Sequence, residues 1–127
     1  MATPARVFHT QQTHFLRKTV TYLNNGSAVE VGVIPANAVV INAGVVVTTA
    51  FNAGSTNVLD IGTSGDDDGF ATDLALGTIG RIAADELATS NDLYSTSDVT
   101  ITATVALSGT AATAGEGIVY VEYLPLL

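Results

Sequence analysis

Residues 29–62 constrain the fold more than any other part of this sequence. They read VEVGVIPANAVVINAGVVVTTAFNAGSTNVLDIG, in which runs of Val, Ile and Thr are separated every few residues by Pro, Gly or Asn. β-Branched side chains are restricted at χ1 and pack well on a pleated surface, so this pattern predicts consecutive short strands and no helix. The run Val45, Val46, Val47 is apolar on both faces. Either both faces are covered, or one of them packs on another subunit.

Strands are also predicted before this stretch. Residues 15–23 form a first strand, and the Asn-Asn-Gly-Ser turn at residues 24–27 leads into a return strand at residues 29–34. The three valines of that return strand share one face. Pro35 ends it, and the Asn-Ala-Gly sequence at residues 42–44 predicts a bulge or corner in the next strand.

The C-terminal part shows the clearest alternation. Residues 98–107 place apolar side chains on one face and threonines on the other, and residues 117–124 return as a paired last hairpin with Tyr120 and Tyr123 on opposite faces. With residues 57–61, this makes about seven or eight short strands along the chain. The pattern predicts an all-β protein, an antiparallel β-sandwich of jelly-roll-like form.

Two segments between the strands are harder to assign. Residues 62–73, GTSGDDDGFATD, predict a polar loop. Residues 81–89 fit a turn or two of helix, and the alternative is an irregular loop with short strand pieces around Leu76 and residues 93–94. Residues 1–14 lack periodicity and predict an extended N-terminal arm, which leaves residues 15–127 as a single domain.

Composition favours a chain that hides surface in contacts with other chains. The 127 residues are 47% hydrophobic and only 13% charged, where about 25% charged is usual, and the mean hydropathy is +0.41. Gly, Asn and Thr interrupt every apolar run before it reaches a membrane-spanning length, so no membrane partner is expected. There is no Cys to form a disulfide or a zinc-thiolate site.

Charge is distributed unevenly along the chain. Arg6, Arg17 and Lys18 precede every acidic residue, and beyond Lys18 the single base Arg81 stands against all twelve carboxylates. Such a body repels phosphates, so nucleic acid is not an expected partner. The arm is both basic and apolar, and an extended segment can add to an exposed sheet edge. We therefore expect it to be mobile in the free protein and to order on a partner, the alternative being that it pairs within its own sheet. The predicted partner contacts are Arg6, Val7, Phe8, Phe15, Arg17 and Lys18.

No motif nominates a catalytic site. Asp66, Asp67 and Asp68 have the oxygen ligands that a cation needs, and Asp60 or Asp73 would complete such a site. The EF-hand spacing is absent, however, and a solvated acidic loop is favoured. There is no GxSxG elbow and no phosphate-binding loop, and both histidines, His9 and His14, lie in the arm. We expect no enzyme activity and no cofactor.

Several segments together resemble the small capsid decoration proteins of tailed bacteriophages, also called cement or head-stabilising proteins. They are IPANAVV, VTTAFNAG, LDIGT and a final hairpin with TATV, SGTAATAG and VYVEY, and the likeness covers most of residues 29–127. The resemblance implies an all-β protein on the outer surface of the virion. It also implies a homotrimer that joins neighbouring subunits of the major capsid protein.

The expected function is therefore structural: a decoration protein that stabilises the assembled phage head. The alternative is a receptor- or glycan-binding β module of a tail fibre or baseplate. That alternative would normally show exposed aromatic side chains on its loops, whereas aromatic residues make up only 6% of this chain and Trp is absent.

Overall fold

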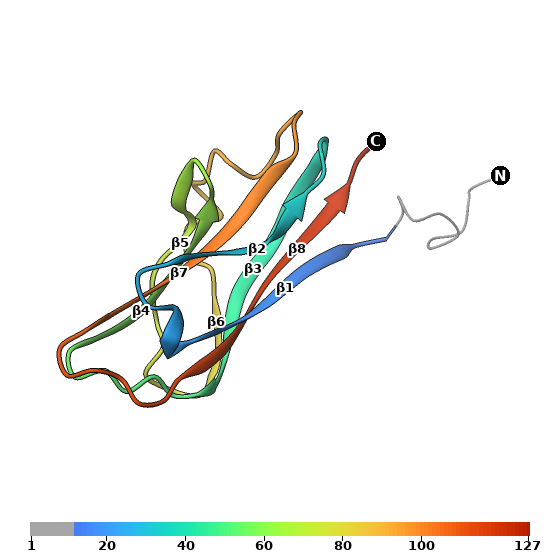
Figure 1. Ribbon diagram of the computed structural model, residues 1–127. Helices are drawn as coiled ribbons and strands as arrows, with labels where there is room; N and C mark the ends of the chain where they lie inside the picture. Colours follow the sequence, from blue (N-terminus) through green and yellow to red (C-terminus); the bar gives the residue numbers. More distant parts are fainter. Residues whose placement is uncertain (1–11) are drawn as a thin grey trace.

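The computed structural model describes residues 12–127, which form eight strands in two layers (Figure 1). A short 3₁₀ helix, Tyr22–Asn24, follows the first strand. The strands are β1 (His14–Thr21), β2 (Ala28–Ile34), β3 (Ala38–Thr49), β4 (Thr56–Thr63), β5 (Asp66–Ala75), β6 (Gly80–Ala83), β7 (Val99–Ser108) and β8 (Glu116–Pro125).

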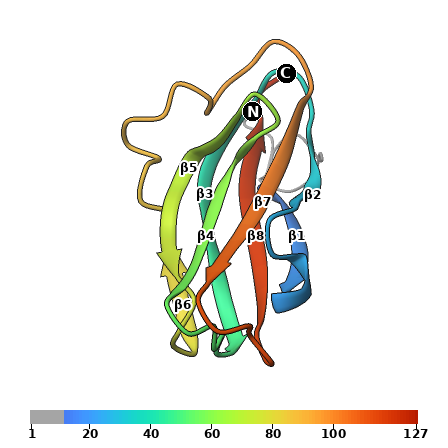
Figure 2. The same cartoon turned by 60° about the vertical axis from the view of Figure 1, so that its left-hand side comes forward.

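The strand order is that of a jelly roll. Sheet I has the order β1-β8-β3-β6, sheet II has the order β2-β7-β4-β5, and all neighbouring strands are antiparallel. The first strand thus pairs with the last, the second with the seventh, the third with the sixth and the fourth with the fifth, as in two Greek keys rolled together. Figure 2 shows β4 and β7 lying over β3 and β8. The predicted all-β, jelly-roll-like sandwich is confirmed.

The core lies between the two sheets and follows the alternation seen in the sequence. β7 turns its apolar face inward, as predicted, and β3, β4 and β8 each turn one of their two faces inward. The fully buried side chains of these four strands include Val45, Val47, Leu59, Ile61, Ile101, Val105, Val119 and Val121. Val46 lies on the other face of β3 and is partly exposed, so the two-sided apolar run leaves one apolar side chain outside the core.

The predicted polar loop at residues 62–73 is wrong. Most of it is strand β5, which forms a tight hairpin with β4 through Ser64 and Gly65. The pairing is close because Gly62 has no side chain: a Cβ there would collide with the backbone of Asp66 and Asp67. Phe70, which has no exposed surface, then anchors β5 in the core, and this burial outweighs the poor strand propensity of the aspartates.

The helix considered for residues 81–89 is also wrong, and the irregular alternative is correct in part, because a bridge forms at Tyr94 but the strand piece lies at residues 80–83 and not around Leu76. Gly80–Ala83 forms β6, in which Arg81 pairs with Val46 of β3, and an irregular connection follows. Tyr94 in that connection makes an isolated bridge to Val39. Edge pairing to β3 satisfies the backbone of this segment, which has too few apolar residues to cover a helix face.

Two hairpins predicted between consecutive strands, β1 with β2 and β7 with β8, are wrong. The chain turns at both places, but the two strands of each pair lie in different sheets. Gly26 adopts a positive φ of 80° at the predicted turn, but β1 pairs with β8 and β2 with β7. The β7–β8 connection likewise crosses between the sheets. The valines of β2 do not share one face either. The register against β7 shifts between Glu30 and Gly32, so Val31 is buried while Val33 is 44% exposed.

The predicted irregularity near residues 42–44 is confirmed. The register of β3 against β8 shifts between Val40 and Asn42, which leaves Ile41 outside the ladder and 48% exposed.

Two phenylalanines provide a matched test of this fold. Phe70→Ala removes a side chain with no exposed surface and is expected to lower the free energy of unfolding by about 3–5 kcal/mol in urea denaturation. Phe15→Ala, at a side chain that is 65% exposed, is expected to change it by no more than about 0.5 kcal/mol. Equal losses in the two variants would contradict the placement of β5.

Candidate functional site: the outer face of sheet I

The outer face of sheet I gathers apolar and basic side chains from three strands. In β8, Val119 and Val121 point into the core, so the alternate residues Ile118, Tyr120 and Glu122 point outward. The register places the outward residues of β1 directly beside them. Phe15 pairs with Glu122, Arg17 with Tyr120 and Thr19 with Ile118.

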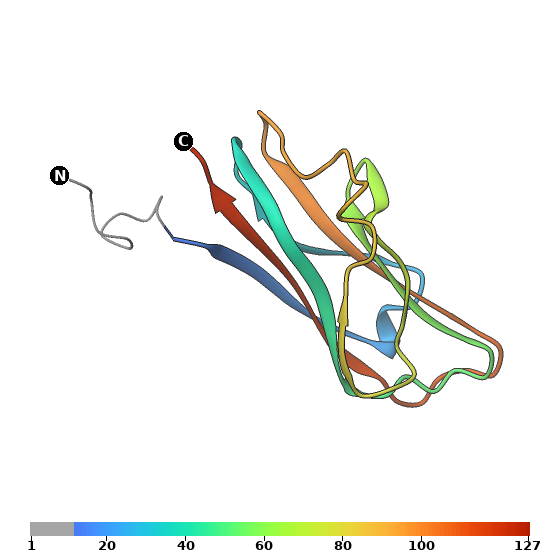
Figure 3. The same ribbon diagram turned by 180° about the vertical axis from the view of Figure 1, so that it is seen from behind.

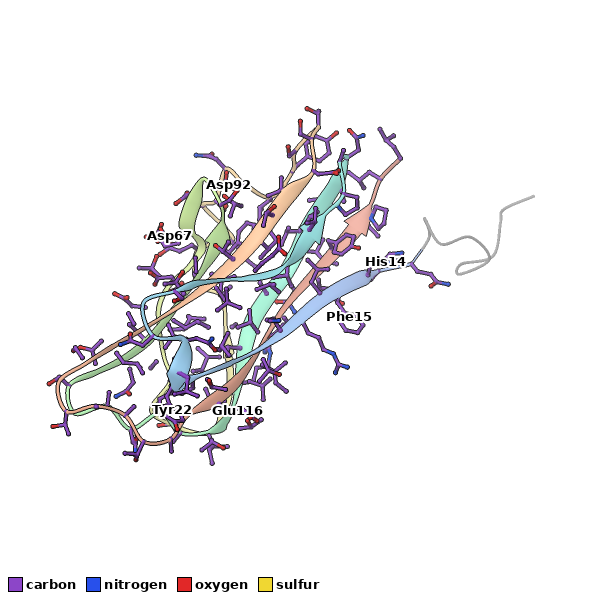
Figure 4. All side chains as sticks on the ribbon, in the orientation of Figure 1. His14, Phe15, Tyr22, Asp67, Asp92 and Glu116 are labelled. Atoms are coloured by element: carbon purple, nitrogen blue, oxygen red, sulfur yellow. The ribbon has the colours of Figure 1, made fainter. Side chains whose placement is uncertain are left out.

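Strand β3 extends this surface on the other side of β8. Val46 pairs with Ile118, which continues the apolar row started by β1 and β8. Phe15 is 65% exposed, and Figure 4 shows its side chain extending away from the sandwich. Ile41, displaced by the bulge in β3, is also largely exposed. The surface therefore presents apolar side chains where an unbound sheet would normally be polar.

Tyr120 occupies the centre of this face and is fixed in place. Gly44, its partner on β3, leaves the space that the ring fills: a Cβ on Gly44 would lie 2.6 Å from the Tyr120 hydroxyl oxygen. The same hydroxyl accepts a hydrogen bond of 2.6 Å from Nε of Arg81, whose guanidinium carbon lies 5.7 Å from the ring centroid. The Tyr120 ring is thus held flat on the sheet, with Arg81 on its β6 side and Arg17 on its β1 side. A rigid aromatic group beside arginines is typical of protein-binding surfaces.

The outer face of sheet II is chemically different. Thr100, Thr102 and Thr104 of β7 lie on the opposite side of the strand from the buried Ile101, Ala103 and Val105. Thr102 is only 8% exposed and its hydroxyl donates to the Thr63 carbonyl, and the Thr104 hydroxyl is also buried. Glu30 pairs with Thr102 and Asp60 with Thr104, so the charged groups of this face are carboxylates and the two faces of the sandwich suit different partners.

The structure places three of the six predicted contact residues. Phe15 and Arg17 lie on the outer face of sheet I, whereas Lys18 has the opposite orientation on β1, in line with Leu16 and Val20, and is exposed. The other three, Arg6, Val7 and Phe8, lie outside the described residues.

Sequence reasoning missed Tyr120, Ile118 and Arg81 as members of one surface. Two signals for it were present: the apolar residues on the second face of β8 and the two-sided run at Val46. What the sequence lacks is any sign that β8 lies between β1 and β3.

The three aspartates considered as cation ligands form part of an acidic region on β5. Ligand oxygens of Asp66, Asp67 and Asp68 all lie within 4.8 Å of one another, and all three residues are exposed. Asp92, from the β6–β7 connection, joins them: a Cβ on Gly69 would be 2.6 Å from its Oδ2 and 3.0 Å from Oδ2 of Asp66. Figure 4 shows Asp67 and Asp92 at the same end of the sandwich. Within residues 12–127 no other group of three such residues has this spacing.

Asp60 and Asp73, the residues considered as additional ligands, bond to each other. The backbone N–H of Asp73, which has a positive φ of 54°, donates a 2.8 Å hydrogen bond to Oδ1 of Asp60. Burial raises the pKa of Asp60 above its ordinary value, and the negative charges of Asp73, Asp67 and Asp68 add to this increase. The hydrogen bond from Asp73 acts in the opposite direction.

Two other expectations concern histidines and membranes. His14 begins β1, and its ring stacks on that of Tyr123 with centroids 5.7 Å apart, while His9 lies outside the described residues. No helix within residues 12–127 is long and apolar enough to span a bilayer.

The acidic region is expected to contribute little to stability. Replacing Asp66, Asp67 and Asp68 together by Asn is expected to change the free energy of unfolding by less than about 0.5 kcal/mol, because exposed charges interact weakly. The measurement is thermal unfolding, with the unmodified protein in excess chelator as the control. A large drop in Tm in both samples would instead show a structural cation.

Asp60 is expected to make stability depend on pH. Because its folded pKa is raised, the folded state holds this proton more tightly, and stability falls as pH rises from the ordinary carboxyl pKa through the raised one. Asp60→Asn keeps the Oδ1 acceptor for Asp73 and is expected to be more stable than the unmodified protein at pH 7, by about 0.2–1 kcal/mol. The gain disappears below the ordinary carboxyl pKa, near pH 3. Glu30→Gln on the same sheet face is the control, and a less stable Asp60→Asn variant at pH 7 would refute this account.

Known proteins with a similar structure are found, but none with a similar sequence. No protein-family model and no curated protein sequence matches this chain. A chain in the structure "Cyanophage Pam1 capsid asymmetric unit" is similar with a TM-score of 0.69 and 19% identity, over 98% of this chain and 93% of that chain. A chain in "Capsid of Ralstonia phage GP4" gives a TM-score of 0.69 and 19% identity, over 100% of this chain and 92% of that one.

A chain in "Acidic stable capsid structure of Helicobacter pylori bacteriophage KHP30" is similar with a TM-score of 0.63 and 19% identity, over 87% of this chain and 86% of that chain. Because identity is this low, the likeness shows a common fold. The chain adopts a jelly-roll fold that is also present in chains of three bacteriophage capsids.

Proposed function

We propose that this protein is a non-enzymatic structural component of a bacteriophage head. In this proposal it binds the outer surface of the major capsid protein lattice as a homotrimer and stabilises that lattice. The observation that carries the proposal is the fold, which is shared over nearly the whole chain with chains from three phage capsids. The resemblance of several sequence segments to decoration proteins supports the same function independently of the structure.

The outer face of sheet I is the proposed surface for the capsid lattice. Its apolar side chains, Phe15 and Ile118 among them, contribute area to bury, and the fixed Tyr120 provides a rigid anchor with little conformational entropy to lose. Arg17 and Arg81 supply donors for carboxylates or carbonyls of a partner. A protein that binds only the assembled lattice stabilises it by RT ln(1 + [L]/Kd) per site, about 2.7 kcal/mol at a hundred times Kd.

The N-terminal arm is proposed as a second contact. It leads directly into β1, which is an edge strand of sheet I, because its only neighbour in the described sheets is β8. Arg6, Val7 and Phe8 of the arm would therefore reach the partner next to the exposed Phe15. The free edge of β1 also suits the alternative, in which the arm or another extended segment adds to this sheet.

The alternative function, a glycan- or receptor-binding module of a tail, has less support. Of the large hydrophobic side chains that are exposed in residues 12–127, only Phe15 and Tyr94 are aromatic. Sugar-binding sites generally present aromatic faces for stacking.

Binding to purified heads that lack the protein tests this proposal. The unmodified chain is expected to co-sediment with heads and to saturate at a copy number comparable to that of the lattice positions, measured by gel densitometry. Phe15→Ser combined with Arg17→Ser is expected to weaken binding about tenfold or more, because both exposed groups are removed from the contact. Deletion of residues 2–11 is expected to weaken it further and to leave β1 intact.

Val33→Ser, at an exposed residue of β2 in sheet II, is the matched control and is expected to bind like the unmodified chain. No binding by the unmodified protein would refute the decoration function, and a handful of copies per virion would favour a tail component. Full binding by both the double variant and the deletion would refute the proposed contact surface.

A further inference from the structure

The connections at one end of the sandwich contain no charged residue. Because the strands alternate in direction, the connections β1–β2, β3–β4, β5–β6 and β7–β8 all lie at the same end (Figures 1 and 3). They consist of residues 22–27, 50–55, 76–79 and 109–115, among which there is no Asp, Glu, Lys, Arg or His. We refer to this surface as the uncharged end. The β6–β7 connection at the opposite end carries Asp85, Glu86, Asp92 and Asp98.

Asparagine side chains hold the loops of the uncharged end together. Oδ1 of Asn52 accepts hydrogen bonds from the backbone N–H groups of Thr113 (2.8 Å) and Ala114 (3.1 Å). Oδ1 of Asn25 accepts a 2.8 Å bond from the N–H of Leu107, and so links the β1–β2 connection to β7. These bonds set the loops in place before any partner arrives, so docking there costs little conformational entropy.

Two large apolar side chains are exposed at the uncharged end. Leu23 is 78% exposed and Ile79 is 67% exposed. Leu23 also borders a depression of about 420 Å³ that Tyr22, Leu107 and the small residues 108–112 line. An exposed leucine beside a recess, on a surface without charges, can be buried by a partner without desolvating any ion.

The charge of the chain favours this end over its other surfaces for contact with a second copy. Each copy has a net charge of −8, so two copies repel wherever their acidic surfaces meet. The outer face of sheet II carries Glu30 and Asp60, and the opposite end carries the carboxylates of β5 and the β6–β7 connection. At the uncharged end two identical chains can approach without placing like charges together. Glu116 borders this end, where its carboxylate accepts a 3.1 Å hydrogen bond from the Thr48 hydroxyl.

We propose that the uncharged end is the contact between copies of this chain, with Leu23 of each copy buried against its neighbour. This inference rests on the homotrimer of the proposed function and assigns it a surface. It leaves the outer face of sheet I free for the capsid lattice. Uncharged loops can meet around a three-fold axis, where heterologous contacts between neighbouring copies close into a ring.

The test is the oligomeric state of charge variants, measured by light scattering over a range of concentrations. Leu23→Asp is expected to weaken self-association about tenfold or more, because the new carboxylate would have to be desolvated beside its symmetry copies. Val33→Asp adds the same charge on sheet II and is expected to associate like the unmodified protein. Far-UV circular dichroism and thermal unfolding establish that both variants fold.

Salt and cross-linking give independent readouts. Salt is expected to strengthen association, because it screens repulsion between chains of charge −8 while the contact itself contains no ion pair. Because the chain has no cysteine, Ala111→Cys at the uncharged end is expected to give cross-linked copies with a short bismaleimide, and Val33→Cys is not. These two measurements need no charged variant to fold.

Three outcomes overturn the contact: an unmodified protein that stays a 13.0 kDa monomer, association that salt weakens, or cross-linking that is equal for the two cysteine variants. Binding to heads, measured separately, decides the decoration function. A monomer that still binds heads would therefore remove this contact and leave the proposed function standing.

Discussion

Pairing of β8 with both β1 and β3 is the interaction on which the rest of this structure depends. β8 lies between these two strands in sheet I, and its inward side chains Val119 and Val121 have no exposed surface. Within residues 12–127 β1 has no other strand neighbour, so sheet I is completed only when the first and last strands come together. Such pairing closes the longest loop available to the chain, which disfavours rapid folding and makes the fold strongly cooperative. It also builds the outer face of sheet I, whose members come from both ends of the sequence.

Charge is segregated in two directions across the sandwich. The outer face of sheet I carries Arg17, Arg81 and Glu122 among apolar residues, whereas the charged groups of sheet II beside β7 are the carboxylates Glu30 and Asp60. Along the strands, one end has only uncharged connections, and the other has the acidic β6–β7 connection beside the aspartates of β5. Neither division is needed for folding, since exposed charges contribute little to stability wherever they lie. Under the proposed function, this arrangement supplies separate surfaces for the capsid lattice and for other copies of the chain.

The alternation of side chains made much of the fold predictable, and its limits explain what was missed. Alternation identified the inward residues of β7 correctly and divided those of β8 into two faces, because a strand buried on one face must alternate. It cannot say which sheet a strand joins, so the β1–β2 and β7–β8 connections were taken for hairpins. It also fails at bulges, where Val33 turns outward after a register shift in β2. β5 was missed because its aspartates suit loops, and burial of Phe70 decided the outcome. The candidate site was predicted only in part: Phe15 and Arg17 were named, but Tyr120 joins them through long-range pairing.

The edges of the two sheets indicate where the molecule is open to further strands. Three edges are protected in ways that natural sheets use: β6 has only 4 residues, β2 contains a register shift, and β5 carries three successive aspartates. β1 differs, because its eight residues pair with β8 without interruption and its other edge has no neighbour in the described sheets. Lys18, which faces inward on β1 yet is exposed, gives this edge a charge that opposes pairing with a second apolar strand. The regular backbone of β1 can pair with an added strand, while Lys18 disfavours pairing with a purely apolar one. This edge therefore resists nonspecific aggregation but can still accept an extended segment whose side chains are compatible with a lysine. Under the proposed function, an extended segment that adds to this edge would be selected by charge as well as by its backbone hydrogen bonds.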